Sequence, residues 1–181
     1  MTTTAVPRLD SSIELADGRS LAYARWGDPD GTPVVLLHGT PGSRLICPDE
    51  DATTDSAVNL LTIDRPGYAR SDPCPDQTLL GFASDFVALA ESLGLPPCPV
   101  VGWSGGGPYA LACAVKSPER TTAIGLVSST GHVDGMPADQ RGLPLEVSRL
   151  IQDVRRGDPG ATELIPKGPA SSPTIRWRYS R

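Results

Sequence analysis

Gly102-Trp103-Ser104-Gly105-Gly106 has the pattern Gly-x-Ser-x-Gly and is the most informative segment of this 181-residue chain. The short apolar run from Pro99 to Gly102 predicts a buried strand. After the pattern, Gly107 to Val115 reads as a helix packed by small residues. A serine on a tight turn from strand to helix is lifted clear of the sheet, so Ser104 is the candidate nucleophile. The alternative is a Gly-rich turn whose serine only caps the next helix.

The two glycines of the pattern have a predicted steric role. Gly102 and Gly106 lie two residues before and two residues after Ser104. Strand and helix approach each other closely at such a turn, and glycine avoids the clash that a Cβ atom would cause. We therefore expect both positions to form the elbow that carries the nucleophile.

Further strands are predicted before and after this segment. Asp17-Gly18 is the strongest two-residue hairpin signal and separates alternating strands at 11–15 and 19–26. Continuous apolar runs predict buried strands at 33–37, 58–63 and 121–128.

Helices are predicted between these strands. A short one is expected at 49–57, and a longer one runs from Leu79 to Leu93, capped by Thr78 and ended by a left-handed Gly94. Alternating strands and helices predict an α/β fold. Its sheet is mostly parallel, has about six strands, begins with an antiparallel hairpin and carries helices on both faces.

The loop after Leu37 is the expected partner of the elbow. A tetrahedral oxyanion needs hydrogen-bond donors from two separate segments. One is the backbone N–H of Gly105, at the positive end of its helix. The other must come from a neighbouring loop, and the segment that begins at His38 qualifies. We interpret His38 as a structural histidine that hydrogen-bonds this loop, not as a catalytic base.

Three segments in order resemble one family. They are LLHGTPGSR (36–44), DRPGYARSD (64–72) and GWSGGGPYALA (102–112). Together they resemble the α/β-hydrolase fold, in its esterase, epoxide-hydrolase and peptidase-like branch, over about residues 11–131. The resemblance implies that Ser104 is the nucleophile and that the N–H groups of Thr40 and Gly105 form the oxyanion hole. It also implies that DRPG marks the end of the fourth strand, beside the pocket.

The base of a catalytic triad is not evident. In this family the order along the chain is Ser, acid, His. The only histidine after Ser104 is His132, followed by Asp134 in the wrong order, and we expect both to be loop or cap residues. The sequence therefore predicts an incomplete chain with little or no activity.

Three regions follow from this reading. Residues 1–131 are the N-terminal part of the hydrolase core, and 132–165 begin a helical cap that includes a helix over about 143–154. Residues 166–181 carry four bases and no acid and lack apolar periodicity, which predicts an irregular, disordered tail or a non-native reading frame.

Composition restricts the partners and the compartment. The net charge of −5 disfavours nucleic acid and anionic membrane surfaces. No apolar run approaches the ~18 residues of a membrane span, and the N-terminus lacks a signal-peptide core. The four scattered cysteines indicate reduced thiols, so a cytoplasmic protein is predicted, with no metal and no cofactor.

Two other functions compete with a serine hydrolase acting on a small ester or amide. One is a non-catalytic binding or interaction remnant of the fold, which could self-associate through an exposed sixth-strand edge. The other is nucleotide binding by Gly105-Gly106-Gly107. The second is disfavoured because no Lys-Ser/Thr follows these glycines.

Overall fold

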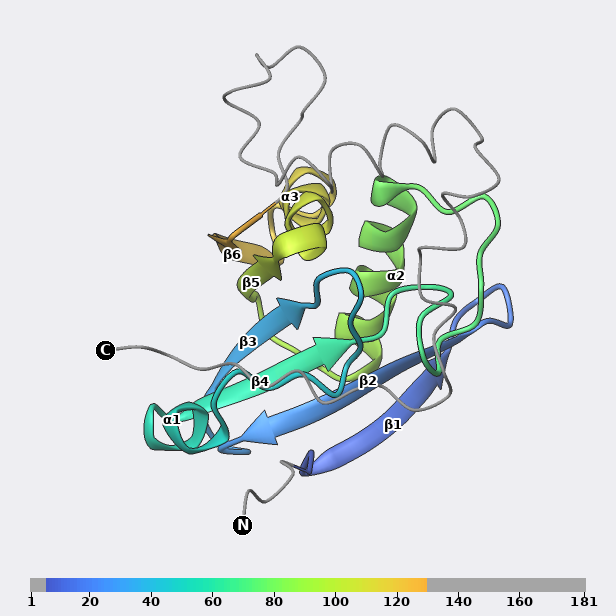
Figure 1. Cartoon of the computed structure of the whole chain (residues 1–181). Helices are drawn as coiled ribbons and strands as arrows, with labels where there is room; N and C mark the ends of the chain where they lie inside the picture. The colour runs from blue at the N-terminus through green and yellow to red at the C-terminus, as the bar shows by residue number, and fades with distance from the viewer. Residues whose placement is uncertain (1–5, 130–181) are drawn as a thin grey trace, which may run out of the picture. The chain divides into compact units, whose positions relative to one another are not determined.

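The computed structural model describes residues 6–129, which contain a six-stranded sheet, three α-helices and one 3₁₀ turn (Figure 1). The sheet order is β1-β2-β4-β3-β5-β6. The elements in chain order are β1 (Leu9–Glu14), β2 (Ser20–Gly27), β3 (Thr32–Leu37), α1 (Glu50–Asp55), β4 (Val58–Ile63), α2 (Leu79–Ser92), β5 (Cys98–Trp103), η1 (Ser104–Gly106), α3 (Gly107–Lys116) and β6 (Thr121–Val127).

Strand pairing confirms the predicted fold class. β1 pairs antiparallel with β2, and β2 pairs antiparallel with β4. The remaining pairs, β3 with β4, β3 with β5 and β5 with β6, are all parallel. The described part of the chain is thus a mostly parallel sheet that starts with an antiparallel hairpin.

The first hairpin differs from the predicted two-residue turn. Leu15 N–H donates to Arg19 O at 2.8 Å, and Gly18 N–H donates to Leu15 O at 2.9 Å, so the loop is longer. Only Gly18 takes a positive φ there, at 84°. A two-residue type I′ turn needs positive φ at both central positions, and Asp17 does not supply it.

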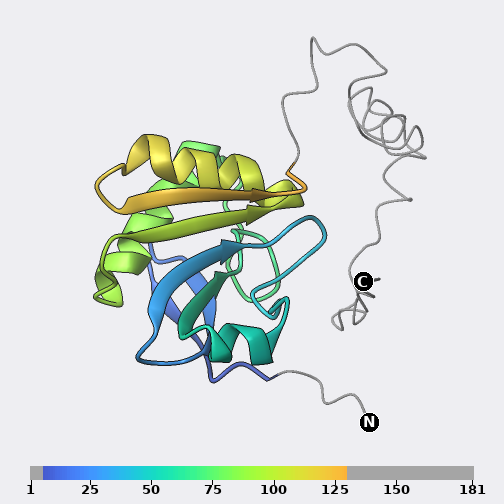
Figure 2. The same cartoon turned by 90° about the vertical axis from the view of Figure 1, so that its left-hand side faces the viewer.

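Neighbouring residues of the central strands face opposite layers. Val35, Leu37 and Val100 pack in the cluster that contains the apolar faces of α2 and α3. Leu36 belongs to a second cluster with Trp26, against which Val101 packs, on the side where α1 lies. Figure 2 shows α1 and α3 in separate layers, with strands between them. The prediction of helices on both faces is confirmed.

The predicted helix ends agree with the structure. The Asp49 side chain accepts from Ala52 N–H and caps α1, and the Thr78 side chain accepts from Gly81 N–H and caps α2. Gly94 has φ of 60°, just after α2 ends. The caps of α2 were therefore predicted from the sequence, whereas the Asp49 cap of α1 was not.

The prediction that 121–128 is a buried strand was wrong. No residue of β6 is fully buried, and Leu126 and Val127 are about half exposed, at 48% and 50%. Among the described residues, β6 pairs only with β5 and forms an edge of the sheet. Its apolar composition resembles that of a central strand and led to the prediction of burial, whereas its place at an edge agrees with the sixth-strand edge that the sequence analysis also considered.

The order of strands reverses direction at β3. The chain passes from β3 to β4 on one side, then returns to place β5 on the other side of β3. In open α/β sheets, ligands bind in the crevice outside the carboxyl ends of the strands at such a reversal. The loops that follow β3 and β5, which begin at His38 and Ser104, are those that meet there.

Several predictions lie outside the described residues. They are the helix at 143–154, the cap region 132–165, the tail 166–181, and the residues His132 and Asp134. Within 6–129, none of the helices has both the length and the apolar character needed to cross a bilayer.

Candidate active site

Ser104 occupies a strained position between β5 and α3. Its φ is +49°, in the left-handed region that L-residues with a Cβ atom rarely adopt. The residue opens the turn η1, which leads directly into α3. Such strain is characteristic of functional positions, and here it separates the serine from the regular strand and helix.

The elbow glycines are sterically required. A Cβ atom on Gly102 would lie 2.5 Å from Gly107 Cα. A Cβ atom on Gly106 would collide with Leu37 O and would lie 2.8 Å from His38 O. These clashes explain the predicted need for glycine at both positions. They also show that the elbow presses against the end of β3, which brings the two loops together.

The loop after β3 lies against the elbow. A Cβ atom on Gly39 would be 3.1 Å from Ser104 Cβ and 3.7 Å from Ser104 Oγ. A Cβ atom on Gly105 would be 3.4 Å from the backbone N of Thr40. The structure thus brings Thr40 next to Gly105, and Gly39 next to Ser104. The Thr40–Pro41 peptide bond is cis.

His38 is buried and both ring nitrogens are engaged. Nδ1 lies 2.7 Å from Gly39 O, and Nε2 lies 3.4 Å from the backbone N of Arg65. A carbonyl oxygen only accepts and a backbone N–H only donates, so the ring is neutral with its proton on Nδ1. Burial, followed by the charge of Arg65, lowers the pKa of His38 to about 4. The interpretation of His38 as a structural histidine fits this geometry.

Arg65, from the segment after β4, lies under the same loop, and sequence reasoning missed its role. Its guanidinium carbon lies 4.5 Å from the Tyr68 ring centroid and 4.6 Å from the Tyr109 ring centroid. Its Nη2 donates to Gly39 O and to Thr40 Oγ1, both at 2.9 Å. Arg65 lies in the segment DRPGYARSD, which the sequence analysis used only to mark the end of a strand, so its contacts became evident only from the tertiary structure.

A second buried charge network fixes the far end of the loop. Arg44 Nη1 lies 2.7 Å from Asp64 Oδ2, and Arg44 Nε lies 2.7 Å from Asp10 Oδ1. The hydrogen bond from Arg44 and that residue's charge hold the pKa of Asp10 below its usual value. The segments 38–44 and 64–72 are therefore joined at both ends, by Arg65 and by Arg44.

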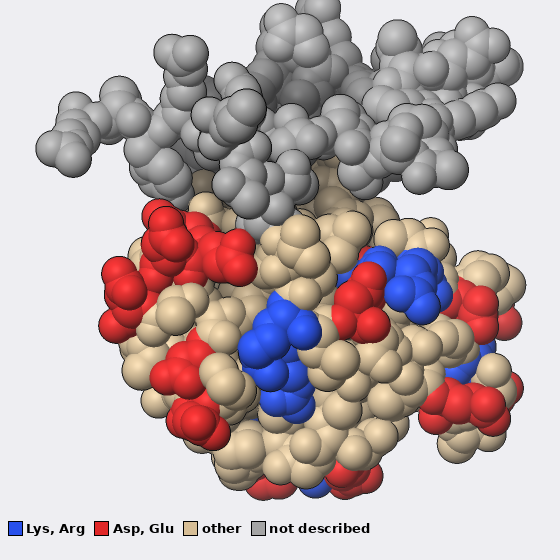
Figure 3. Space-filling model, turned by 90° about the horizontal axis from the view of Figure 1, so that it is seen from below, with Lys and Arg blue, Asp and Glu red and all other residues tan. Residues whose placement is uncertain are grey.

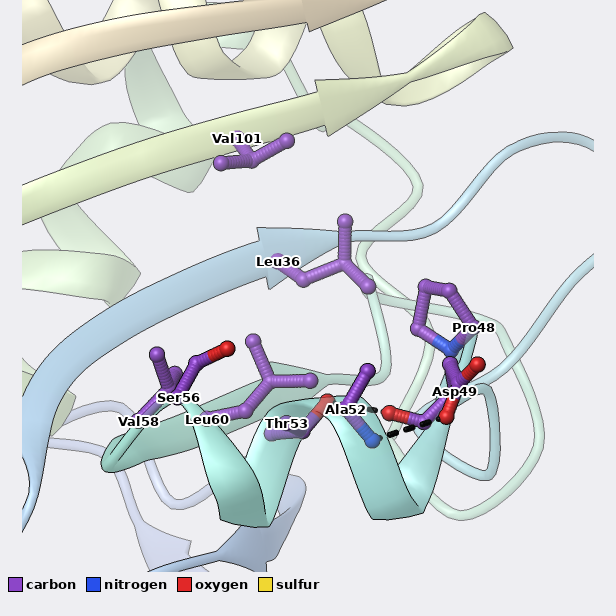
Figure 4. A pocket seen from close by; sticks show the side chains of 9 residues that line it. All are labelled: Leu36, Pro48, Asp49, Ala52, Thr53, Ser56, Val58, Leu60 and Val101. Carbon is purple, nitrogen blue, oxygen red and sulfur yellow. Dashed lines mark hydrogen bonds between the residues drawn. The ribbon is translucent and has the colours of Figure 1, made fainter.

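A cavity of about 320 Å³ lies elsewhere, between α1 and strands β3, β4 and β5 (Figure 4). Its lining is mostly apolar and includes Leu36, Leu60 and Val101. Asp49 also lines it, but its carboxylate is used to cap α1. None of the elbow or loop residues described above lines this cavity, so it is separate from the candidate active site.

The charged side chains of the described residues are distributed in small groups. The face in Figure 3 carries acidic and basic side chains in separate small groups, without a continuous basic stripe. Within the part of the chain that the structure describes, no three His, Cys, Asp or Glu side chains are grouped to hold a metal ion. The chemistry available at the site is that of a serine hydroxyl and neighbouring backbone amides.

Comparison with protein families gives one match over most of the chain. The family model described as the α/β-hydrolase fold matches residues 32–168. The esterase from Exiguobacterium antarcticum superposes with a TM-score of 0.66 at 24% identity, over 86% of this chain and 59% of that one. An epoxide hydrolase from an endophytic Streptomyces has a TM-score of 0.56 at 28% identity, over 65% and 36%.

Characterised proteins that are similar in sequence include enzymes of different names. The non-heme chloroperoxidase of Streptomyces lividans is 34% identical over 143 residues, which cover 75% of this chain and 51% of that protein. The proline iminopeptidase of Xylella fastidiosa (strain 9a5c) is 35% identical over 113 residues, which cover 60% and 36%. The chain thus spans from about half to about a third of the length of these relatives.

Proposed function

Because this chain belongs to the α/β-hydrolase family, we propose that it is a serine-nucleophile hydrolase of small ester or amide substrates. The observation that carries the proposal is the placement of Ser104. It has a left-handed backbone, lies between β5 and α3, and contacts the loop after β3 at the reversal of strand order. A hydroxyl presented in this way is accessible to a substrate in the crevice.

The chemical step is acyl transfer. Ser104 Oγ attacks the substrate carbonyl carbon, a C–O bond forms, and the carbonyl π electrons move onto oxygen. The N–H groups of Thr40 and Gly105 stabilise that oxyanion. Collapse expels the alcohol or amine, and water then releases the acid. Gly102 and Gly106 contribute by allowing the elbow to form.

The proton of Ser104 needs an acceptor. His38 is unsuited because its Nε2 lone pair is engaged and its pKa lies near 4. No other histidine lies within residues 6–129, and His132 lies outside them. We therefore propose little or no turnover by these 181 residues, with weak acylation supported by the oxyanion hole. Such residual catalysis reaches roughly 10³–10⁴ over water in serine hydrolases without a working triad.

Covalent labelling tests the nucleophile. The full chain is incubated with an excess of a fluorophosphonate, and the adduct is located by intact mass and peptide mapping. We expect one adduct, on Ser104, that is absent from Ser104→Ala and retained by Ser84→Ala, a change on the exposed face of α2. Absence of any adduct on the native chain, or equal labelling of Ser104→Ala, overturns the proposal. Absence of any adduct would favour a non-catalytic binding protein, and equal labelling of Ser104→Ala would point to another nucleophile.

A further inference from the structure

The peptide unit between Gly39 and Thr40 is held by its carbonyl oxygen. Gly39 O accepts from His38 Nδ1 at 2.7 Å and from Arg65 Nη2 at 2.9 Å. The Gly39–Thr40 bond is not among the cis peptides, so its C=O and the Thr40 N–H point in opposite directions within one plane. Anchoring the oxygen on one side therefore fixes the direction of the Thr40 N–H, whose nitrogen lies 3.4 Å from where a Cβ atom on Gly105 would be.

Arg65 is an unusual group to find in this position. It is 3% exposed, and no described carboxylate forms an ion pair with it. Its Nε has no hydrogen-bond partner among the described residues. Burying a cation without a carboxylate is unfavourable, and the faces of Tyr68 and Tyr109 offset part of that cost. Arg65 Nη2 donates hydrogen bonds to Gly39 O and Thr40 Oγ1, so the positive charge lies beside these two oxygens.

The charge also changes the strength of the donor. A peptide whose carbonyl accepts a charge-assisted hydrogen bond is polarised, and its own N–H becomes a better donor. We propose that Arg65 is a positioning residue that aims and polarises the Thr40 N–H toward the oxyanion. This inference rests on the proposed function, because it assumes that the Thr40 N–H faces the reacting carbonyl.

A cysteine nucleophile makes the inference testable without a general base. In a Ser104→Cys background the thiolate attacks p-nitrophenyl acetate, a C–S bond forms through an oxyanion, and p-nitrophenolate leaves. The same thiolate displaces iodide from iodoacetamide, a step with no oxyanion. The ratio of the two rate constants at position 104, measured by peptide mass mapping, reports on the oxyanion hole alone. Cys74, which is partly exposed and outside the site, is the internal reference.

Three arginine variants are compared in that background. Arg65→Met is expected to lower the acylation-to-alkylation ratio at position 104 about tenfold, a partial loss against the 10²–10³ typical of deleting an oxyanion donor. Arg65→Lys is expected to recover part of the ratio, because its ammonium keeps the charge but is one bond shorter. Arg70→Met, on the same loop and 56% exposed at its side chain, is the charge-matched control and is expected to leave the ratio unchanged.

The outcomes separate the two proposals. If the ratio at position 104 does not exceed that at Cys74, the oxyanion hole is absent and the proposed function itself fails. If the ratio at position 104 exceeds that at Cys74 but Arg65→Met and Arg65→Lys leave it unchanged from the Ser104→Cys parent, the role of Arg65 is overturned. Should Arg65→Met fail to fold, Arg65→Lys decides alone. An equal fall in acylation and alkylation shows general disruption and also counts against positioning.

Discussion

The guanidinium of Arg44 and the carboxylate of Asp64 form a buried ion pair, with Nη1 2.7 Å from Oδ2 and the Asp64 side chain fully inaccessible. Asp64 Oδ1 also accepts from the backbone N–H of Arg44, and Oδ2 from that of Arg70. One carboxylate at the end of β4 thus holds both the loop after β3 and its own loop. The position of the candidate active site depends on this pair.

Removing the carboxylate should therefore be costly. Asp64→Asn leaves the Arg44 guanidinium buried with only Asp10 as its partner. We expect a loss of about 3 kcal/mol in the free energy of unfolding, the scale observed when one partner of a buried pair is removed. Urea denaturation followed by circular dichroism measures it. The exposed pair Arg120–Glu91 supplies the control, since Glu91→Gln should cost less than about 1 kcal/mol. Equal effects would show that the buried pair does not hold the loops.

The fold could be predicted from the sequence because its signals are local. The apolar runs of β3 and β4, the Thr78 cap and the glycines of the elbow each report on neighbouring residues. The hairpin at Gly18 and the burial of β6 were misjudged because loop length and edge position depend on the whole sheet.

The site was only partly predictable. The Gly-x-Ser-x-Gly pattern predicts the roles of Ser104 and Gly105, and the family resemblance alone implies that of Thr40. Arg44, Asp64 and Arg65 lie in two of the family-like segments, but the sequence did not predict their roles, because these arise from contacts between residues 20 or more positions apart. Buried charge networks of this kind are visible only after the chain has folded.

The elbow glycines provide a steric prediction. Gly106→Ala would place a Cβ atom against Leu37 O, a backbone atom that cannot move without shifting β3. We expect a destabilisation of about 3 kcal/mol, the upper range for overpacking. Gly81→Ala in α2 is the control, because the nearest atom to its Cβ, at 3.1 Å, is the side-chain oxygen of the cap residue Thr78 and not a strand backbone atom. Its effect should stay within about 1 kcal/mol. Thermal unfolding of both variants measures the difference.

The buried His38 predicts a dependence of stability on pH. Its pKa is lowered to about 4 in the folded chain, from 6.5, by burial and by Arg65. Between these values the unfolded state binds the proton and the folded state does not, so stability falls as pH drops from 6.5 to 4. The full loss is roughly 3 kcal/mol. The Asp10 carboxyl, whose pKa is lowered, affects stability in a different pH range, because its contribution is lost only as the pH falls below its ordinary pKa of 3.8.

Urea titrations at pH 7, 5.5 and 4.5 test this assignment. His38→Asn retains an N–H that can donate to Gly39 O but has no titrating ring. We expect it to be less stable at pH 7 and to lose less stability on acidification than the native chain. Parallel pH profiles for the two proteins would show that another group controls the acid side.

The exposed edge at β6 leads to a proposal about assembly. Among the described residues, β6 has a strand partner on one side only, and this open edge with its half-exposed apolar side chains favours pairing with a second copy. Ala123→Lys places a charge on the exposed part of β6 and is expected to shift the chain toward monomer in sedimentation velocity. Val115→Lys on α3, which removes a 75% exposed apolar side chain that is not part of β6, should have no such effect. A native chain that sediments as a monomer contradicts self-association.

The strain at Ser104 predicts an exchange of stability for reactivity. A residue with a Cβ atom at φ of +49° costs roughly 1–2 kcal/mol, whereas glycine takes this conformation freely. Ser104→Gly should therefore raise the free energy of unfolding by about 1 kcal/mol while abolishing fluorophosphonate labelling. Ser104→Ala abolishes labelling but retains the Cβ atom, so it should bring no such gain. Ala57→Gly, at φ of 51° and remote from the elbow in sequence, is the matched control and should stabilise by a similar amount with labelling intact. If Ser104→Gly is no more stable than Ser104→Ala, the left-handed backbone at the elbow is not a stored strain.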